Sequence, residues 1–236
     1  MTNANATAAP LRGDMSRREV VDTRDLAWTE APGGQVWRKR LHRVGPAEAG
    51  EVTSLVRYVP GASFHSHPHP DGEEIFVIEG HFCDQQAVSG PGTFLLHPEG
   101  FEHAPWSEDG CLLLVKLRQY SGEGRTYVTR DTEAMGWADS DTPGVMVKPL
   151  YADARFPDET RLERWAAGTE LPARVFPDGA ELFVLEGGFG DEQGKYGLHT
   201  WLRLPPGSSH RPVSPQGCLV YIKTGGVAQL QHDPGR

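Results

Sequence analysis

The stretch "GASFHSHPHPDGEEIFVIEG", residues 61–80, decides the fold and raises the question of function. Three histidines, His65, His67 and His69, stand on alternate positions, and two glutamates follow them before an apolar run. Because side chains of an extended strand alternate between its two faces, the three imidazoles point the same way if the segment is extended. A metal site, a solvated histidine-rich loop and a chance cluster on a strand each explain this pattern, and the rest of the chain decides between them.

The composition indicates a globular chain that is rich in turns. The chain has 236 residues, of which 38% are apolar, and it contains 28 glycines and 19 prolines. This length suffices for one large domain or two ordinary ones, and the apolar fraction suffices for a core. The net charge of −9, without a basic block, argues against nucleic acid as a partner. The apolar runs are too short to cross a bilayer, so we expect no membrane partner.

The three cysteines predict a reduced protein. Cys83, Cys111 and Cys218 form an odd and widely spaced set, which favours a cytoplasmic location. Cys111 and Cys218 occupy matching positions of the repeat described next, and we expect them to pack inside the fold as small hydrophobic side chains. Cys83 has no such counterpart, so an exposed redox-active thiol is an alternative there.

The chain consists of two copies of one unit. Residues 61–116 align without a gap with residues 168–223, and "PDGEEIFVIEG" (70–80) lies over "PDGAELFVLEG" (177–187). Such a period is too long for a solenoid repeat and fits a duplicated small domain.

The repeat also predicts the domain boundaries. We expect one domain over residues 19–125 and a second over residues 126–230, with "SGEGR" (121–125) as the linker. The residues that precede the first domain begin with small and polar side chains and lack the apolar segment of a signal peptide. Residues 1–18 are therefore expected to form a disordered tail.

Each copy predicts short strands. The segments "EEIFVIEG" (73–80), "TFLLHP" (93–98) and "GCLLLVKL" (110–117) are apolar, β-branched or aromatic, and clusters of glycine and proline close them. Helical periodicity is weak. The sequence therefore predicts an all-β protein, with an antiparallel sandwich or small barrel in each copy.

Two hairpins bring candidate ligands together. A turn at residues 70–72 returns the chain and presents Glu73, and the segment "GTFLLHPEGFEH" (92–103) ends in His103 after a second turn. The result is a group of imidazoles with one carboxylate, a donor set that suits divalent iron, zinc, manganese, nickel or copper.

These residues resemble the two sequence motifs of the cupin family. The first motif, G-x5-H-x-H-x3-E-x6-G, is met at every position, namely Gly61, His67, His69, Glu73 and Gly80. The resemblance implies two tandem cupin barrels, each a double-stranded β-helix or jelly roll.

The second motif, G-x5-P-x-G-x2-H-x3-N, is met at Gly92, Pro98, Gly100 and His103. Ser107 stands where the family usually has asparagine; that asparagine is not a metal ligand, so the departure leaves the site intact. In detail the chain is similar to the ChrR-like branch, which holds the cupin domain of zinc-dependent anti-sigma factors and the acetylacetone-dioxygenase-like proteins.

The resemblance implies a metal site in the first copy. It assigns His67, His69, Glu73 and His103 as ligands of one divalent metal per chain, with iron(II) or zinc(II) expected first and manganese(II) or nickel(II) as alternatives. It also allows a homodimer, because dimerisation is common in such folds.

Two further histidines are candidates for moving protons. His65 is either a group behind the ligands that carries protons or a solvated histidine, and Pro172 replaces it in the second copy. His97 precedes the turn at Pro98 and either borders the pocket or serves the turn alone; Leu204 replaces it in the second copy.

The second copy lacks most of the ligands. Arg174, Phe176 and Ala180 lie where the first copy has its two motif histidines and its glutamate, and His210 alone is retained. Without imidazole and carboxylate donors the second copy is expected to be metal-free and structural. Arg174 and His210 either form an anion pocket or simply pack.

Three classes of function follow. The first is a metal-dependent dioxygenase that acts on a small chelating molecule such as a β-diketone or hydroxyketone. The second is a ChrR-like sensor or regulatory cupin without catalysis, although the chain lacks a cluster of metal-binding cysteines and histidines near its N-terminus. The third is a metal-dependent isomerase or lyase. The carboxylate of Glu73 departs from the three-histidine site of the acetylacetone-dioxygenase-like proteins, which leaves the substrate open.

Overall fold

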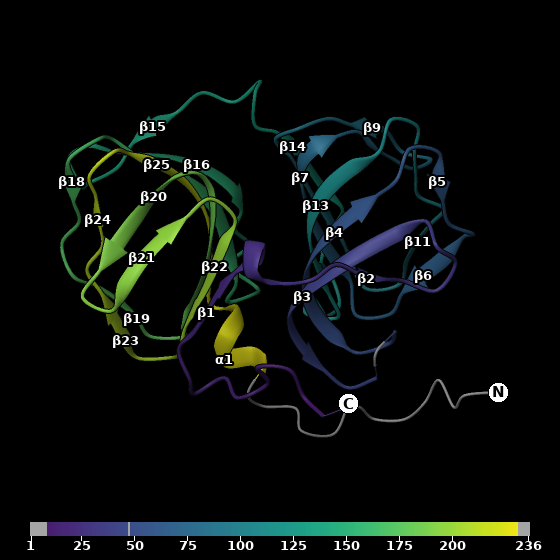
Figure 1. The fold of residues 1–236 in the computed structure, drawn as a ribbon, viewed down its shortest axis with the longest axis horizontal. Helices are drawn as coiled ribbons and strands as arrows, with labels where there is room; N and C mark the ends of the chain where they lie inside the picture. Colours follow the sequence, from purple (N-terminus) through teal and green to yellow (C-terminus); the bar gives the residue numbers. More distant parts are fainter. Residues whose placement is uncertain (1–8, 47, 231–236) are drawn as a thin grey trace. The chain divides into compact units, whose positions relative to one another are not determined.

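The computed structural model describes residues 9–46 and 48–230, which fold into two compact units built from antiparallel strands. Of the described residues, 9–13 and 26–134 belong to the first unit, and 14–25 and 135–230 belong to the second. The predicted all-β fold is confirmed (Figure 1).

The strands of the first unit are mostly short. They are β2 (Thr29–Glu30), β3 (Val36–Val44), β4 (Glu51–Tyr58), β5 (Ala62–Ser63), β6 (His67–His69), β7 (Glu73–Gly80), β8 (Phe82–Cys83), β9 (Val88–Ser89), β10 (Thr93–His97), β11 (Phe101–His103), β12 (Trp106–Ser107), β13 (Cys111–Leu117) and β14 (Val128–Asp131). A seven-stranded sheet has the order β14-β10-β7-β13-β4-β3-β2, and two smaller sheets have the orders β5-β12-β8-β9 and β11-β6.

The second unit repeats this arrangement. Its elements are β1 (Glu19–Asp22), the 3-10 helix η1 (Thr23–Asp25), β15 (Ala138–Asp139), β16 (Val145–Tyr151), β17 (Glu159–Trp165), β18 (Thr169–Glu170), β19 (Arg174–Phe176), β20 (Ala180–Asp191), β21 (Gly194–Gly197), β22 (Thr200–Leu204), β23 (Ser208–His210), β24 (Val213–Ser214), β25 (Cys218–Thr224) and the helix α1 (Gly226–Leu230). Its large sheet runs β1-β22-β20-β25-β17-β16-β15.

The edge strands do not follow the repeat boundaries. Strand β1 lies before most of the first repeat but pairs with β22 in the second unit (Figure 1). Strand β14 lies after the expected linker but pairs with β10 in the first unit. The compact units therefore differ from domains cut at residues 19–125 and 126–230.

The residues expected to form a tail make specific contacts where the structure describes them. Leu11 forms a β-bridge with Arg43, the side chain of Met15 is 4% exposed, and Arg18 forms an ion pair with the buried Asp191. Residues 1–8 of the expected tail lie outside the described residues.

Each unit has an apolar core between its sheets. The inward-facing side chains of β4, β7 and β13 form the first core, and those of β17, β20, β22 and β25 form the second. Cys111 and Cys218 lie in these cores, as expected. At one corner of the first sheet, Gly80 has a φ of 67°, and an added Cβ would collide with the carbonyl oxygen of Gly110. Only glycine fits this close approach of two strands.

Candidate metal centre

Strands β6, β7 and β11 bring the predicted ligands to one place. Because β6 and β11 pair antiparallel, His67 lies opposite His103. Glu73 opens β7 directly after the turn at residues 70–72. This turn requires Gly72, whose φ is 73° and whose Cβ, if present, would lie 2.8 Å from the Cβ of Tyr120.

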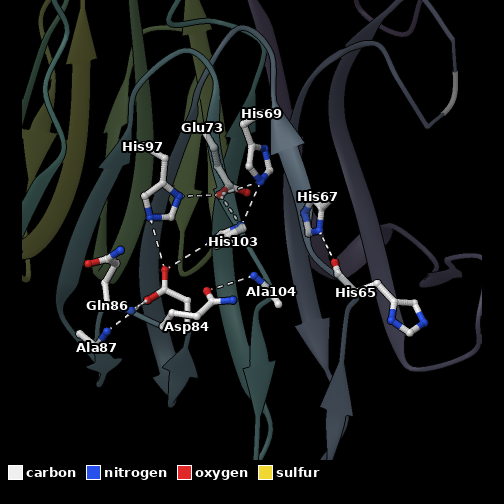
Figure 2. A network of polar contacts seen from close by, with 11 residues as sticks. His65, His67, His69, Glu73, Asp84, Gln86, Ala87, His97, His103 and Ala104 are labelled. Carbon is white, nitrogen blue, oxygen red and sulfur yellow. Dashed lines mark hydrogen bonds and ion pairs between the residues drawn. The ribbon is translucent and has the colours of Figure 1, made fainter.

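Four donor groups point toward a common centre (Figure 2). The Nε2 atoms of His69 and His103 lie 3.0 Å apart. Oε2 of Glu73 lies 3.5 Å from Nε2 of His69 and 3.6 Å from Nε2 of His103. His67, half-buried, lies within 4.8 Å of the same two histidines through its ligating nitrogen. His67, His69 and His103 thus form one group with metal-ligand spacing, and Glu73 joins it through its contacts with His69 and His103.

Hydrogen bonds orient two of these imidazoles. The Nδ1 atom of His67 donates to the carbonyl oxygen of His65 at 2.9 Å. The Nδ1 atom of His103 donates to Oδ2 of Asp84 at 3.3 Å. In a neutral imidazole this leaves Nε2 with a lone pair, and such a bond behind a histidine is the usual way in which a metal-binding ring is held.

The spacing of the donors fits a divalent metal. Two nitrogens that each lie about 2.0–2.1 Å from a shared metal are about 2.8–3.4 Å apart at square or tetrahedral angles. The donor separations of 3.0, 3.5 and 3.6 Å among His69, His103 and Glu73 lie close to this range. Imidazole and carboxylate are also the donors that first-row divalent metals accept.

His97 belongs to the buried network, and the structure excludes a role in the turn alone. Its side chain is 0% exposed, and its Nδ1 donates to Oε2 of Glu73 at 2.8 Å. The ring stacks on Phe101 with centroids 4.3 Å apart and also lies nearly parallel to Tyr127. Within the described part of the chain its Nε2 has no hydrogen-bond partner, and it lies 3.8 Å from Oδ2 of Asp84. Glu73, His97 and His103 accordingly form a second group with metal-ligand spacing.

The structure does not bring the side chain of His65 to the centre. His65 is exposed and its ring points away from the other histidines (Figure 2). It precedes β6, so the strand alternation that would align it with His67 does not extend to it. Its contribution is the main-chain carbonyl that holds His67.

Burial and nearby charges hold His69 and Glu73 in the protonation states that bind a cation. Burial lowers the pKa of His69 to about 4, with the repulsion of His103, His67 and His97 adding to it against the attraction of Glu73. Burial alone would raise the pKa of Glu73, but the attraction of His69 and the hydrogen bond from His97 outweigh it and lower that pKa to about 2. Near neutral pH the centre thus offers a neutral imidazole and a carboxylate anion, the protonation states that metal binding requires.

The centre opens into a small cavity with mainly apolar walls. The cavity has a volume of about 110 Å³, and all four predicted ligands, His67, His69, Glu73 and His103, lie in its wall. Its remaining walls are the side chains of Val36, Arg38, Val56, Tyr58, Phe64, Ile75, Phe82, Pro105, Leu113, Val115 and Leu117. Arg38 is the one cation in this lining.

The residues of the second unit that correspond to the predicted ligands make other contacts. Arg174 forms an ion pair with Glu163 at 2.6 Å, and Nε2 of His210 lies 3.0 Å from Oδ2 of Asp191. Phe176 and Ala180 fill the other ligand positions as part of the core. The described residues of this unit contain no group of side chains with metal-ligand spacing. Because Arg174 and His210 already have acidic partners, an anion pocket between them is not favoured.

Sequence reasoning missed one residue of the first unit and gave a wrong alternative for another. The missed residue is Asp84, which accepts a hydrogen bond from His103. The repeat could have revealed it, because Asp191 is retained at the matching position and contacts His210. Cys83 is 4% exposed and burial raises its pKa, so the structure does not support an exposed reactive thiol.

The described part of the chain contains only short helices, and none has the length and apolarity to span a bilayer.

The fold and the donor cluster define a cupin with two tandem barrels. The sequence profile of the ChrR cupin-like domain matches residues 16–121 and again residues 125–228. The chain therefore belongs to the ChrR cupin-like family, and the resemblance seen in its motifs is confirmed. No protein with a curated description matches the sequence significantly.

Solved structures support the fold at low identity. A proposed dioxygenase of Nostoc punctiforme has a TM-score of 0.72 at 15% identity, and the alignment covers 90% of this chain and 84% of that one. A proposed glyoxylate-induced protein of Pseudomonas aeruginosa has a TM-score of 0.68 at 11% identity, covering 95% and 92%. Salicylate 1,2-dioxygenase of Pseudaminobacter salicylatoxidans has a TM-score of 0.60 at 12% identity, covering 90% and 85%. At these identities the likeness shows the shared fold alone.

Proposed function

We propose that the protein is a metal-dependent dioxygenase that acts on a small chelating molecule of the β-diketone or hydroxyketone type. The observation that carries this proposal is the position of the donor cluster on a cavity of about 110 Å³ with apolar walls. A cavity of this size suits a small substrate. A bound metal would supply a Lewis-acid centre with positions open for a chelating substrate and dioxygen.

The side chains around the centre would hold the ligands and manage protons. His67, His69, His103 and Glu73 are the proposed ligands. His97 fixes the carboxylate of Glu73 through its Nδ1–H, and it lies between that carboxylate and Asp84. A proton taken up at Nε2 of His97 would face Oδ2 of Asp84, so His97 can hold a proton that an acidic substrate loses. The mainly apolar lining offers water few hydrogen-bond partners in the same space.

The test is dioxygen consumption by the metal-loaded protein. Iron(II)-loaded protein should consume dioxygen when a β-diketone or hydroxyketone is added, and mass spectrometry should detect an oxygen-containing cleavage or oxidation product. Elemental analysis should find one metal per chain. A loaded protein that binds these molecules without consuming dioxygen would exclude the dioxygenase.

A second candidate is a regulatory cupin that binds metal without catalysis. The family match to the ChrR cupin-like domain favours it. This candidate predicts that a metal or small ligand changes the affinity for a protein partner, while dioxygen is not consumed. Pull-down experiments with and without metal separate the two candidates.

A further inference from the structure

Two arginines on β3 extend the surface that faces the metal centre. Arg38 lines the cavity of the centre and also a second cavity of about 50 Å³, and Arg40 lines the second cavity. The two cavities share Val56, Val115 and Leu117 as well as Arg38. They are therefore neighbouring parts of one tract.

An apolar stretch separates the arginines from the metal ligands. Glu73 lies on β7, and β13 and β4 stand between β7 and β3 in the sheet. Neighbouring strands are about 4.8 Å apart, so three steps separate the two backbones by roughly 14 Å. Val115 and Val56 line the tract along the way. A long arginine side chain reaches back over part of this distance.

The charge of the tract is positive at this end. Glu48 accepts from both guanidinium groups, at 2.6 Å from Arg38 and 3.0 Å from Arg40. Among the described residues, the single negative charge of Glu48 is therefore shared by the positive charges of Arg38 and Arg40. One of these two positive charges has no acidic partner of its own. Burial lowers the pKa of Arg40, and the repulsion of Arg38 adds to this effect. A second anion would relieve that repulsion.

A buried hydroxyl group marks the same end of the tract. Ser54 lies opposite Arg40 in the register of β3 and β4 and lines the second cavity. Its residue is 2% exposed, and its Oγ has no hydrogen-bond partner among the described residues. Because a buried hydroxyl group normally finds a partner, this atom points to a polar ligand group.

The second unit provides an internal comparison. In the first unit Val36 lies opposite Tyr58, and in the second unit Val145 lies opposite Trp165, so these two pairs occupy the same place in their sheets. By the same register Val147 and Pro149 take the places of Arg38 and Arg40. The arginines are therefore present in the unit that has the metal ligands and absent from the unit that has lost them. A purely structural role in the barrel does not predict this joint loss.

We infer that Arg38, Arg40 and Ser54 form a carboxylate subsite, so that the bound molecule is a small dicarbonyl chelator with a carboxylate at the end away from the metal. This inference rests on the proposed function, because the chelating end is assigned to the metal centre. It narrows the substrate class from neutral diketones to acidic ones. Arginine suits this task because its planar group can donate two hydrogen bonds to one carboxylate.

The test uses two ligands that differ only at the far end. 4,6-Dioxoheptanoate and heptane-2,4-dione share the chelating group, and the first has a carboxylate where the second has a methyl group. Isothermal titration calorimetry without dioxygen, on the protein loaded with the metal that copurifies, should show the acidic ligand binding roughly 10- to 100-fold more tightly, as expected for a charge-assisted hydrogen bond.

Matched variants assign the difference to the subsite. Arg38→Val and Arg40→Met should remove most of the preference and leave the dissociation constant of the neutral dione within about twofold. Arg57→Met is the control, because Arg57 is an exposed arginine on the neighbouring strand β4, packed on Trp28 and absent from both cavities. It removes the same charge and should keep the preference. Metal content and circular dichroism establish that each variant is folded and loaded.

The outcomes separate the subsite from the proposed function. Equal affinities for the two ligands in the wild type, or an unchanged preference in both arginine variants, would overturn the carboxylate subsite while the metal-centred function stands. If the loaded protein binds neither ligand, the proposed function fails and the subsite fails with it.

Discussion

The proposed ligand His103 of the first unit and its counterpart His210 in the second should respond differently to replacement. His103→Ala removes a donor from the cluster, so the metal content of the purified protein should fall well below one per chain. His210→Ala is the matched control, because His210 contacts Asp191 in a unit without a donor cluster. Elemental analysis of both variants provides the measurement, and equal metal loss in both would contradict the assignment.

Asp84 should set the affinity of the centre without touching the metal. Burial would raise its pKa, but the hydrogen bond to His103 and bonds from main-chain amides outweigh this and lower it. Asp84→Asn removes the charge that holds the imidazole, and loss of such a partner costs roughly 10–100-fold in metal affinity. Competition with a chelator measures this change. Asp191→Asn should leave the affinity unaltered.

For single residues, the sequence predicts the proposed ligands better than the residues that hydrogen-bond to them. His67, His69, Glu73 and His103 follow fixed spacings within two hairpins, so their convergence can be anticipated. Asp84 comes from a loop after β8 whose position depends on non-local pairing, which spacing does not reveal. His65 was expected to share a face with His67, but the strand begins only at His67.

At the scale of the element, one glycine allows two strands to meet. Gly80→Ala places a methyl group against the carbonyl oxygen of Gly110, whereas Gly61, with a φ of 81°, has nothing within 4 Å of an added Cβ. Gly61→Ala should therefore lower the free energy of unfolding only by the backbone cost of about 1–2 kcal/mol. Gly80→Ala should lower it distinctly further. Urea unfolding measures both, and equal losses would refute the steric explanation.

The long strands are predictable and the short ones are not. The apolar runs expected at 73–80, 93–98 and 110–117 appear as Glu73–Gly80, Thr93–His97 and Cys111–Leu117. Strands such as β5, β8 and β12 have two residues each, too few for a periodic pattern. Their existence depends on partners that are distant in the sequence, and the membership of β1 and β14 in their sheets escapes prediction for the same reason.

For the whole molecule, metal should stabilise the first unit alone. A ligand that binds only the native state adds roughly 2.7 kcal/mol at a hundredfold excess over its dissociation constant. Calorimetry should therefore show one part of the unfolding transition moving to lower temperature when a chelator removes the metal. Adding the chelator should not change the unfolding transition of the His103→Ala protein. If the chelator still lowers the unfolding temperature of that variant, a single metal centre at His103 is contradicted.

The second unit should lose stability in acid. Burial raises the pKa of Glu163, but Arg161, Arg174 and the hydrogen bond from Trp165 outweigh it and hold that pKa below the ordinary value of 4.5. Because the pKa of Glu163 is lower in the folded state than in the unfolded state, its ionised form stabilises the fold above pH 4.5. This stabilisation is lost as the pH falls through the pKa of the folded state. The free energy of unfolding of the metal-free protein should decline below about pH 4.5, and the decline should be shallower in Glu163→Gln.

The pairing of β1 with β22 has a consequence for biosynthesis. The ribosome makes β1 long before the strand that receives it, because residues 23–199 lie between β1 and Thr200–Leu204. At a synthesis rate of ~5–20 residues per second, the early segment waits on the order of ten seconds or more for its partner. The second unit can therefore complete its large sheet only after Thr224 has left the ribosome, whereas the sheet that holds Glu73 can be complete when Asp131 has emerged.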